Sequence, residues 1–177
     1  ERSMLVRTDA NGTRALRWYA SVIAAVAGGL LLDAATPGLS WWPLAFPAVA
    51  LVCAAVWQQR ARWGFLVGAL AGAAFWMPHI GWLTLYLGPV PWAARCALMI
   101  LWFGLFGVAA AVATRGLRRI AILRRSAAAL AGAQAASVAG LWMLREQLQG
   151  AIPYGGFAWG RLATTQADGP LLQSVSW

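Results

Sequence analysis

Few side chains of this sequence are suited to covalent or acid–base chemistry, and they lie far apart along the chain. A nucleophilic cysteine needs a nearby base or cation that stabilises its thiolate. Cys53 and Cys96 both lie inside apolar runs, and the chain contains no lysine. It also contains no lysine-bearing phosphate loop, no cluster of metal ligands and no Gly-x-Ser-x-Gly elbow. We therefore expect no complete active site, no metal and no cofactor in this chain, and we interpret both cysteines as core residues.

His79 is the only histidine, and it follows Pro78 near the middle of a long apolar run. A proline inside a helix removes a backbone donor and kinks the helix, which frees a carbonyl. One interpretation of His79 is a proton relay or a ligand within a membrane. The other is a neutral ring that bonds the freed backbone or that lies nearer the outer interface. We favour the second, because no other histidine, cysteine or carboxylate lies nearby in the sequence.

Three carboxylates remain as candidates for acid or base chemistry. Asp33 ends the first apolar run, where we expect it to be solvated. Glu146 stands beside Arg145, and Asp168 lies in the polar C-terminal stretch. A single glutamate can act as a general acid or base. A structural ion pair or helix cap is the simpler interpretation of Glu146.

The composition indicates which elements must position these residues. Charged residues make up 11% of the chain and hydrophobic residues 61%, whereas soluble domains have about 25% charged residues. A membrane-spanning helix needs about 20 apolar residues. Five apolar runs approach or exceed this length, namely Leu16–Leu32, Trp41–Trp57, Trp63–Leu87, Trp92–Thr114 and Ser126–Leu144. The sequence thus predicts an all-α integral membrane protein whose bundle of about five transmembrane helices occupies residues 15–144.

The arginines predict an orientation for this bundle. With the N-terminus inside, the outer segments hold only Arg95, Arg145 and Arg161 of the 14 basic residues. Cytoplasmic segments of membrane proteins carry an excess of basic residues. We therefore predict a multi-pass protein of the plasma membrane, with a mobile cytoplasmic arm at 1–14 and an extracytoplasmic loop at 145–177. Because topology accounts for the arginines, we expect no nucleic-acid partner.

Small residues at intervals of four predict close contacts between helices, since backbones must approach closely where lipid is as apolar as the side chains. Such residues recur on the third and fifth predicted helices, as Gly64, Gly68 and Gly72 and as Ala128, Gly132, Ala136 and Gly140. Gln134 lies on the fifth helix, and we expect its amide to face protein rather than lipid.

Two motifs in this order resemble a known family. The first is Ser40-Trp41-Trp42-Pro43-Leu44-Ala45, and the second is Gly155-Gly156-Phe157-Ala158-Trp159. Together they resemble the N-terminal membrane part of bacterial apolipoprotein N-acyltransferase in its actinobacterial form. The resemblance covers most of the chain after Arg14. The chain departs from the family pattern at Ala158, where the family usually has proline.

The resemblance implies a two-part enzyme in which membrane helices carry a nitrilase-like domain on the outer face. That domain supplies a Glu-Lys-Cys triad, whose cysteine takes an acyl chain from a phospholipid donor as a thioester. The acyl chain then passes to the α-amine of the diacylglyceryl-cysteine of a lipoprotein acceptor. None of the triad maps onto this sequence. We therefore expect a further helix and the catalytic domain to follow Trp177.

The resemblance also suggests a role for the polar C-terminal stretch. We predict that Gly156, Phe157, Trp159 and Arg161 shape a lipid entrance beneath the catalytic domain. Glycines permit unusual backbone shapes, aromatic rings suit the headgroup level of a membrane, and an arginine can attract a lipid phosphate. The alternative is a loop that only packs on the bundle and holds the catalytic domain in place.

Two readings of the whole chain compete with this one. Some relatives of this region are joined to, or associate with, a polyprenol-phosphate mannose synthase, so the bundle could be a non-catalytic anchor for such a partner. A small transporter is the weaker alternative, because the sequence shows no paired intramembrane charges and no inverted halves.

Overall fold

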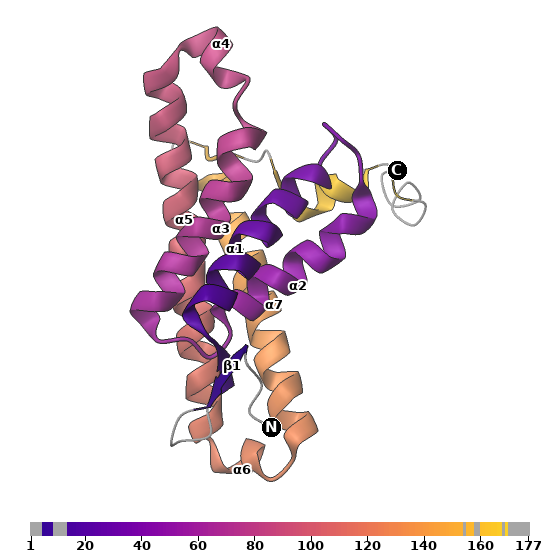
Figure 1. Ribbon diagram of the computed structural model, residues 1–177, viewed down its shortest axis with the longest axis vertical. Coiled ribbons are helices and arrows are strands. Elements are labelled where there is room, and N and C mark those ends of the chain that lie inside the picture. Colours follow the sequence, from indigo (N-terminus) through magenta and orange to yellow (C-terminus); the bar gives the residue numbers. More distant parts are fainter. Residues whose placement is uncertain (1–4, 9–13, 154, 158–159, 168, 170–177) are drawn as a thin grey trace.

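The computed structural model describes residues 5–8, 14–153, 155–157, 160–167 and 169 of the chain. Within these residues the fold is mostly helical (Figure 1). The long helices are α1 (Trp18–Ala34), α2 (Ala45–Val56), α3 (Ala61–His79), α5 (Pro89–Gly116) and α7 (Ala127–Ala151). Each overlaps one predicted apolar run, so the helical nature of those runs is confirmed. The shorter helical elements are η1 (Trp42–Leu44), α4 (Leu83–Leu87), η2 (Leu117–Arg119), α6 (Ala121–Arg124) and η3 (Leu162–Gln166).

The third predicted helix is shorter than its apolar run. Helix α3 ends at His79, and the chain turns before entering α4. In this turn Gly81 N donates to Pro78 O, and Thr84 N donates to Gly81 O. Both hydrogen bonds join residues three positions apart, as in a 3-10 helix, and they turn the chain more tightly than an α-helix does. Pro78 therefore lies in the last turn of α3, and the prediction that it kinks the middle of a helix is wrong. Gly88, at a φ of 83°, ends α4 and leads directly into α5.

The fifth predicted helix is longer than its apolar run. Helix α7 begins after Ser126, whose side chain accepts a hydrogen bond from Ala129 N at 3.2 Å, as an N-cap does. It continues to Ala151, so the first seven residues of the predicted 145–177 loop are helical. The polar residues that suggested a loop instead face the bundle, because Arg145 and Gln149 are buried.

Helix α3 packs between α1 and α5, and α7 packs against α5 (Figure 1). The predicted contact through the α3 glycines is confirmed. A Cβ placed on Gly64 would lie 2.6 Å from Gly107 O, and one placed on Gly68 would lie 2.5 Å from Phe103 O. The matching prediction for α7 is wrong for its glycines, because a Cβ on Gly132 or Gly140 would meet nothing within 4 Å. Small residues at this spacing allow a close approach but do not place a neighbour on that face.

The predicted environment of Gln134 is confirmed. Its side chain is 3% exposed, and its Nε2 donates to Thr114 O at 2.6 Å. This bond links α7 to the last turn of α5. Burying an amide without a hydrogen-bond partner costs free energy. This contact therefore determines which face of α7 packs against α5.

One end of the bundle is tied together around Gln58, in the turn between α2 and α3. Its Oε1 accepts from Arg14 N at 2.8 Å, and its backbone N donates to Thr114 Oγ1 at 2.9 Å. Its carbonyl accepts from Arg115 Nη1 at 3.5 Å. Gln59 adds a bond from its Nε2 to Leu16 O at 2.9 Å. The N-terminal segment, the α2–α3 turn and the end of α5 therefore meet at the same end.

The N-terminal arm is not irregular where the structure describes it. Strands β1 (Val6–Thr8) and β2 (Arg14–Leu16) form an antiparallel hairpin in which Arg7 pairs with Ala15. These residues of the arm therefore have regular structure, while the mobility and the cytoplasmic location of the arm stay predictions. The side-chain amides of Gln58 and Gln59 bond both ends of β2 and so hold the hairpin against the bundle.

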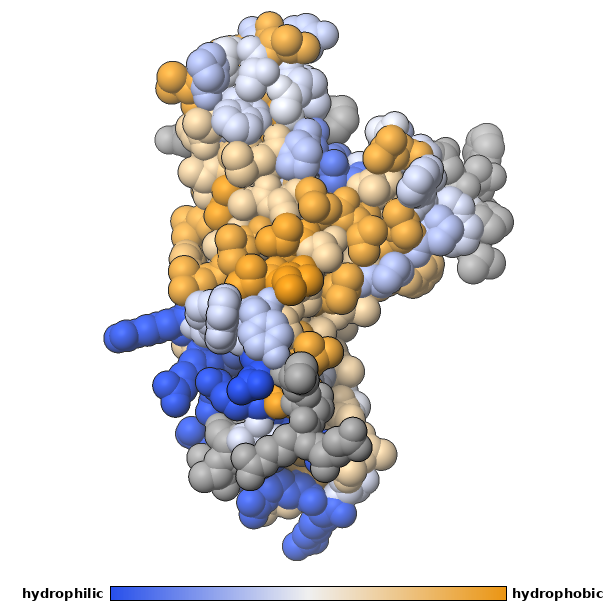
Figure 2. Space-filling view, viewed as in Figure 1, coloured by the Kyte–Doolittle hydropathy of each residue, from blue (hydrophilic) through white to orange (hydrophobic). Residues whose placement is uncertain are grey.

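The surface separates apolar from hydrophilic residues along the molecule. Figure 2 shows an apolar band around the middle and hydrophilic side chains at the end that carries β1 and α6. In the described residues, α7 and the stretch of α5 and η2 from Pro89 to Arg119 are long and apolar enough to cross a membrane, whereas α1 and α2 are shorter. Five spans and their orientation stay predictions.

Candidate functional site

A cavity of about 570 Å³ lies at the end of the molecule opposite the Gln58 turn. Its walls come from the end of α1 and the following turn, from the end of α3, and from the segment that contains η3. The polar lining residues are Asp33, Thr36, His79 and Thr164. Three segments that are distant in sequence thus converge on one hollow.

The structure pairs the histidine with a carboxylate. His79 Nδ1 lies 3.1 Å from Asp33 Oδ1 and 3.4 Å from Thr36 Oγ1. The side chains of His79 and Asp33 are 14% and 26% exposed, so both still reach solvent. The interpretation of His79 as a ring bonded to a freed backbone carbonyl is wrong, because its ring bonds side chains, whereas a place near the outer interface stays a prediction. Asp33, which we expected to be solvated, is partly exposed and is also bonded to His79.

Phe157 anchors the C-terminal segment to the bundle. Its ring lies 5.8 Å from the ring of Trp76, and the guanidinium carbon of Arg95 lies 4.9 Å from its centroid. Its backbone N donates to Gln149 O at 2.9 Å, and its carbonyl accepts from Gln149 Nε2 at 3.4 Å. Phe157 therefore holds the segment against the ends of α3, α5 and α7.

Gly156 allows the C-terminal segment to lie this close to α7. Its φ is 70°, in the left-handed region that favours glycine. A Cβ at this position would overlap the backbone of Gly150 and Ala151 in the last turn of α7. The chain can therefore pass this close to α7 only with glycine at 156.

A buried ion pair lies beneath the segment. Arg145 is 4% exposed, and its guanidinium carbon lies 4.3 Å from the Phe103 ring centroid and 4.7 Å from that of Trp142. Its Nη2 lies 3.3 Å from Glu146 Oε1, and its Nη1 donates to Gln149 Oε1 at 2.8 Å. The interpretation of Glu146 as a structural ion pair is confirmed.

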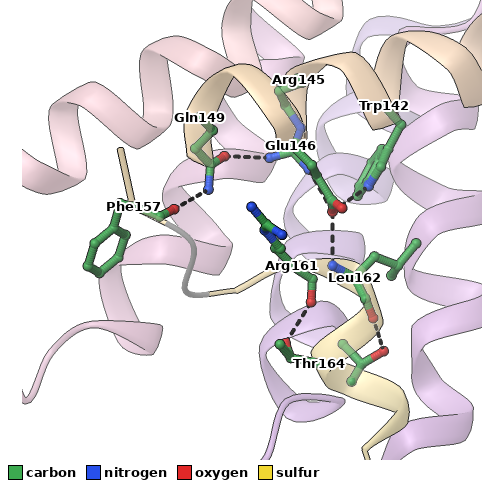
Figure 3. A network of polar contacts seen from close by, with 9 residues as sticks. Trp142, Arg145, Glu146, Gln149, Phe157, Arg161, Leu162 and Thr164 are labelled. Carbon is green, nitrogen blue, oxygen red and sulfur yellow. Dashed lines mark hydrogen bonds and ion pairs between the residues drawn. The ribbon is translucent and has the colours of Figure 1, made fainter. Parts of the chain in front are cut away.

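Glu146 also fixes the start of η3. Its Oε1 accepts from Leu162 N at 2.9 Å and from Trp142 Nε1 at 2.9 Å. One carboxylate oxygen thus receives donors from α7 and from the C-terminal segment (Figure 3). Because η3 carries Thr164, this contact sets the position of one cavity wall.

Arg161 is the arginine of this network that forms no ion pair with any of the described residues. Figure 3 shows its side chain pointing into the space between Gln149 and Glu146. Its Nε is buried and has no hydrogen-bond partner among the described residues. A Cβ on Gly150 would lie 2.5 Å from Arg161 Nη2, so the guanidinium rests directly on the α7 backbone. A guanidinium whose Nε lacks a partner among these residues suits an anionic ligand group.

Of the four residues predicted to shape an entrance, the structure brings three into this network, while Trp159 lies outside the described residues. Gly156, Phe157 and Arg161 all contact the end of α7 through backbone or side-chain atoms. The three arginines predicted on the outer side also gather here. Arg95 and Arg145 each face an aromatic ring, and Arg161 lies over Gly150.

The pairing of Asp33 with His79 was missed from sequence. The available signal was that an ionisable residue in an apolar run needs a polar partner. Neither cysteine belongs to the cavity lining. Cys96 is buried, with its Sγ 3.9 Å from Trp76 O, and Cys53 packs against the core.

Two comparisons with known proteins agree on a family. The sequence model of the apolipoprotein N-acyltransferase N-terminal domain matches residues 28–177. A stretch of 98 residues is 38% identical to the apolipoprotein N-acyltransferase of Mycolicibacterium smegmatis, strain ATCC 700084 / mc(2)155. That alignment covers 54% of this chain and 16% of the relative's length. Neither match names a glycosyltransferase, so the mannose synthase anchor gains no support from them.

Proposed function

The chain belongs to the apolipoprotein N-acyltransferase N-terminal domain family, and from that premise we propose that it is the membrane part of such an enzyme. The enzyme moves an acyl chain from a phospholipid to the α-amine of a lipoprotein's diacylglyceryl-cysteine. The extent of the family match, residues 28–177, is the observation that carries this proposal. The name of the Mycolicibacterium relative supports it.

The chemical step belongs to groups outside this chain. Acyl transfer in two steps needs a nucleophile that forms a covalent intermediate and a base that activates it. Cys96 is 4% exposed, Cys53 packs against the core, and neither lines the cavity that contains His79. A catalytic domain with its own cysteine and lysine therefore performs the transfer, and this chain anchors that domain at the membrane.

The cavity end of the bundle faces outward in this proposal. Basic residues favour the cytoplasmic side, and the Gln58 end carries arginines of the hairpin, of α3 and of the α5–α6 region. Several helices then cross the plasma membrane, with the apolar band of Figure 2 in the hydrocarbon. The cavity opens where a lipid headgroup and an extracytoplasmic domain meet.

The C-terminal segment forms part of the lipid entrance. Gly156 and Phe157 seat the segment on α7, and Gly160 and Thr164 line the cavity. The Nε of Arg161 has no hydrogen-bond partner in the described part of the chain, and its guanidinium could bind a lipid phosphate. Trp159 lies outside the described residues, and its part in the entrance is proposed from the motif alone. The alternative role, in which the segment only holds the catalytic domain in place, predicts no effect of Trp159 on turnover.

Acylation of a diacylglyceryl peptide by the full-length gene product tests the proposal. Wild-type enzyme should transfer an acyl chain from added phospholipid, and an inactive, correctly folded product would refute the enzymatic assignment. Trp159→Ala should lower kcat/KM by roughly tenfold, because the lipid contact that we propose for this aromatic side chain would contribute about 1.5 kcal/mol. Trp18→Ala is a matched control, since Trp18 is 69% exposed at the start of α1. Equal turnover of both variants would rule out the entrance role.

A further inference from the structure

A second hollow, of about 230 Å³, lies at the Gln58 end of the molecule, opposite the cavity that contains His79. Its walls come from the N-terminal hairpin, from the start of α1 and from the start of α3. The lining residues are Arg7, Leu16, Trp18, Gln59, Arg60 and Trp63. None of them lines the His79 cavity. This hollow, the basic pocket, is therefore a separate site.

Two arginines from separate elements line the basic pocket. Arg7 lies on β1 and Arg60 directly precedes α3, and both side chains are exposed. Neither forms an ion pair with a residue that the structure describes. The described carboxylates, Asp33 and Glu146, lie at the opposite end of the bundle. Among the described residues, the two positive charges of the pocket thus have no counter-charge.

The two helices that meet at the basic pocket begin without an acceptor side chain. Serine, threonine, aspartate and asparagine are the usual N-caps, because their side-chain oxygen accepts from the first N–H groups of a helix. Ser126 does so at α7, but the N-caps of α1 and α3 are Arg17 and Arg60, and neither side chain caps its helix. The N-terminal end of a helix favours an anion. This adds to the attraction that the two pocket arginines exert on a negative group.

The other walls of the basic pocket are largely aromatic and lie at the level of the membrane surface in the proposed orientation. Trp63 is held by a hydrogen bond from its Nε1 to Ser21 Oγ at 2.9 Å, whereas Trp18 is exposed. The start of α1 lies where the apolar band of Figure 2 meets the hydrophilic end. Tryptophan is favoured at the headgroup level of a membrane. Arginines beside such side chains suit the phosphate of a lipid better than a free anion, which gains nothing from an aromatic wall.

We propose that the basic pocket binds the phosphate of an anionic phospholipid through Arg7 and Arg60. A guanidinium donates in a planar fork that matches two phosphate oxygens, and basic pockets on the cytoplasmic side of membrane proteins bind anionic headgroups. The glycerol portion and the first part of the acyl chains lie along Leu16, Trp18 and Trp63. That this lipid belongs to the cytoplasmic leaflet rests on the orientation in the proposed function, whereas the preference for an anion rests on the pocket itself.

Equilibrium binding to the full-length gene product in micelles of a neutral detergent tests this inference without any acyl transfer. The ligands are dihexanoylphosphatidylglycerol, dihexanoylphosphatidylcholine and inorganic phosphate. We expect the glycerol lipid to bind about tenfold more tightly than either of the others, because each basic residue near a membrane surface adds to the attraction of a net negative headgroup. Arg7→Gln combined with Arg60→Gln should abolish that ratio. Arg124→Gln combined with Arg125→Gln removes the same charge from the same end of the molecule, but outside the pocket, and should leave the ratio unchanged.

Each other outcome overturns a stated part of the inference. Equal affinity for the glycerol and choline lipids would exclude recognition of an anionic headgroup, and inorganic phosphate binding as tightly as the glycerol lipid would exclude the lipid portion. Equal losses in the two double variants would show that the general charge of this end acts, and not the pocket. If the Arg7 and Arg60 double variant fails to fold, Arg60→Gln alone should lower the ratio about threefold while Arg60→Lys retains it, and an unchanged ratio in Arg60→Gln would refute the site. Loss of acylation with the ratio retained would refute only the proposed function.

Discussion

The close contact between α3 and α5 predicts opposite effects for the same substitution at two glycines. In Gly68→Ala, the added Cβ would lie 2.5 Å from Phe103 O and 3.1 Å from the Cα of Gly107. Ordinary contact begins at 3.4 Å, and the obstructing atoms belong to the backbone, so no side chain can rotate away. In Gly132→Ala the new methyl group would meet nothing within 4 Å.

The expected magnitudes follow from these two environments. Overpacking costs about 1–3 kcal/mol, and the upper value applies at Gly68 because whole helices must separate. Replacing glycine with alanine inside a helix stabilises the helix by about 1 kcal/mol through helix propensity, which offsets part of this cost. Gly68→Ala should therefore lower the free energy of unfolding by about 2 kcal/mol, or roughly 30-fold in the folding equilibrium. Gly132→Ala should raise it by about 1 kcal/mol.

Unfolding of the full-length product by sodium dodecyl sulfate, followed by far-ultraviolet circular dichroism, measures both changes. The comparison is internally matched, because both variants add one methyl group to a helical glycine. If Gly68→Ala proved as stable as wild type, or tracked Gly132→Ala, the close packing of α3 against α5 would be refuted.

The other predictions concern charge. Glu146→Gln leaves Arg145 buried without its counter-charge and should lower the free energy of unfolding by about 3 kcal/mol in the same assay. Arg145→Met combined with Glu146→Gln should recover part of that loss, and a loss below about 1 kcal/mol in the single variant would show that the ion pair adds little. In a cysteine-free variant, cysteine placed at the exposed Gly38 should react with an impermeant maleimide on intact cells, whereas cysteine at Gly116 should react only after lysis. The reverse pattern would contradict the proposed orientation.

The five long helices were predictable because each overlaps one uninterrupted apolar run. The C-terminal ends of α3 and α7 were not predictable. Polar residues at Arg145 and Gln149 suggested a loop, yet they continue α7, since each finds a partner inside the bundle. Pro78 suggested a kink, yet it lies in the last turn of α3. The sequence shows where polar residues lie. Whether a helix continues through them depends on whether tertiary contacts supply hydrogen-bond partners for their side chains.

The same limit applies to the candidate site. Gly156 and Phe157 were identified from a motif, and the structure adds that they are seated on α7. Asp33 and His79 were each noticed, but their pairing joins residues 46 positions apart. Nothing in local periodicity indicates that the end of α1 lies beside the end of α3. Helix packing decides such a contact, and glycine spacing alone misplaced one of the two predicted packing faces.

The hydrogen bonds of Gln58 have a mechanical consequence, because they join β2, the α2–α3 turn and the end of α5. The side chain of Gln58 bonds β2, and its backbone bonds Thr114 and Arg115 of α5. A displacement of the α2–α3 turn would therefore also displace β2 and the end of α5. Because α1 and α3 are in contact at backbone level toward their other ends as well, where a Cβ on Gly29 would overlap Ala71 O, the distance between Asp33 and His79 is held from both ends.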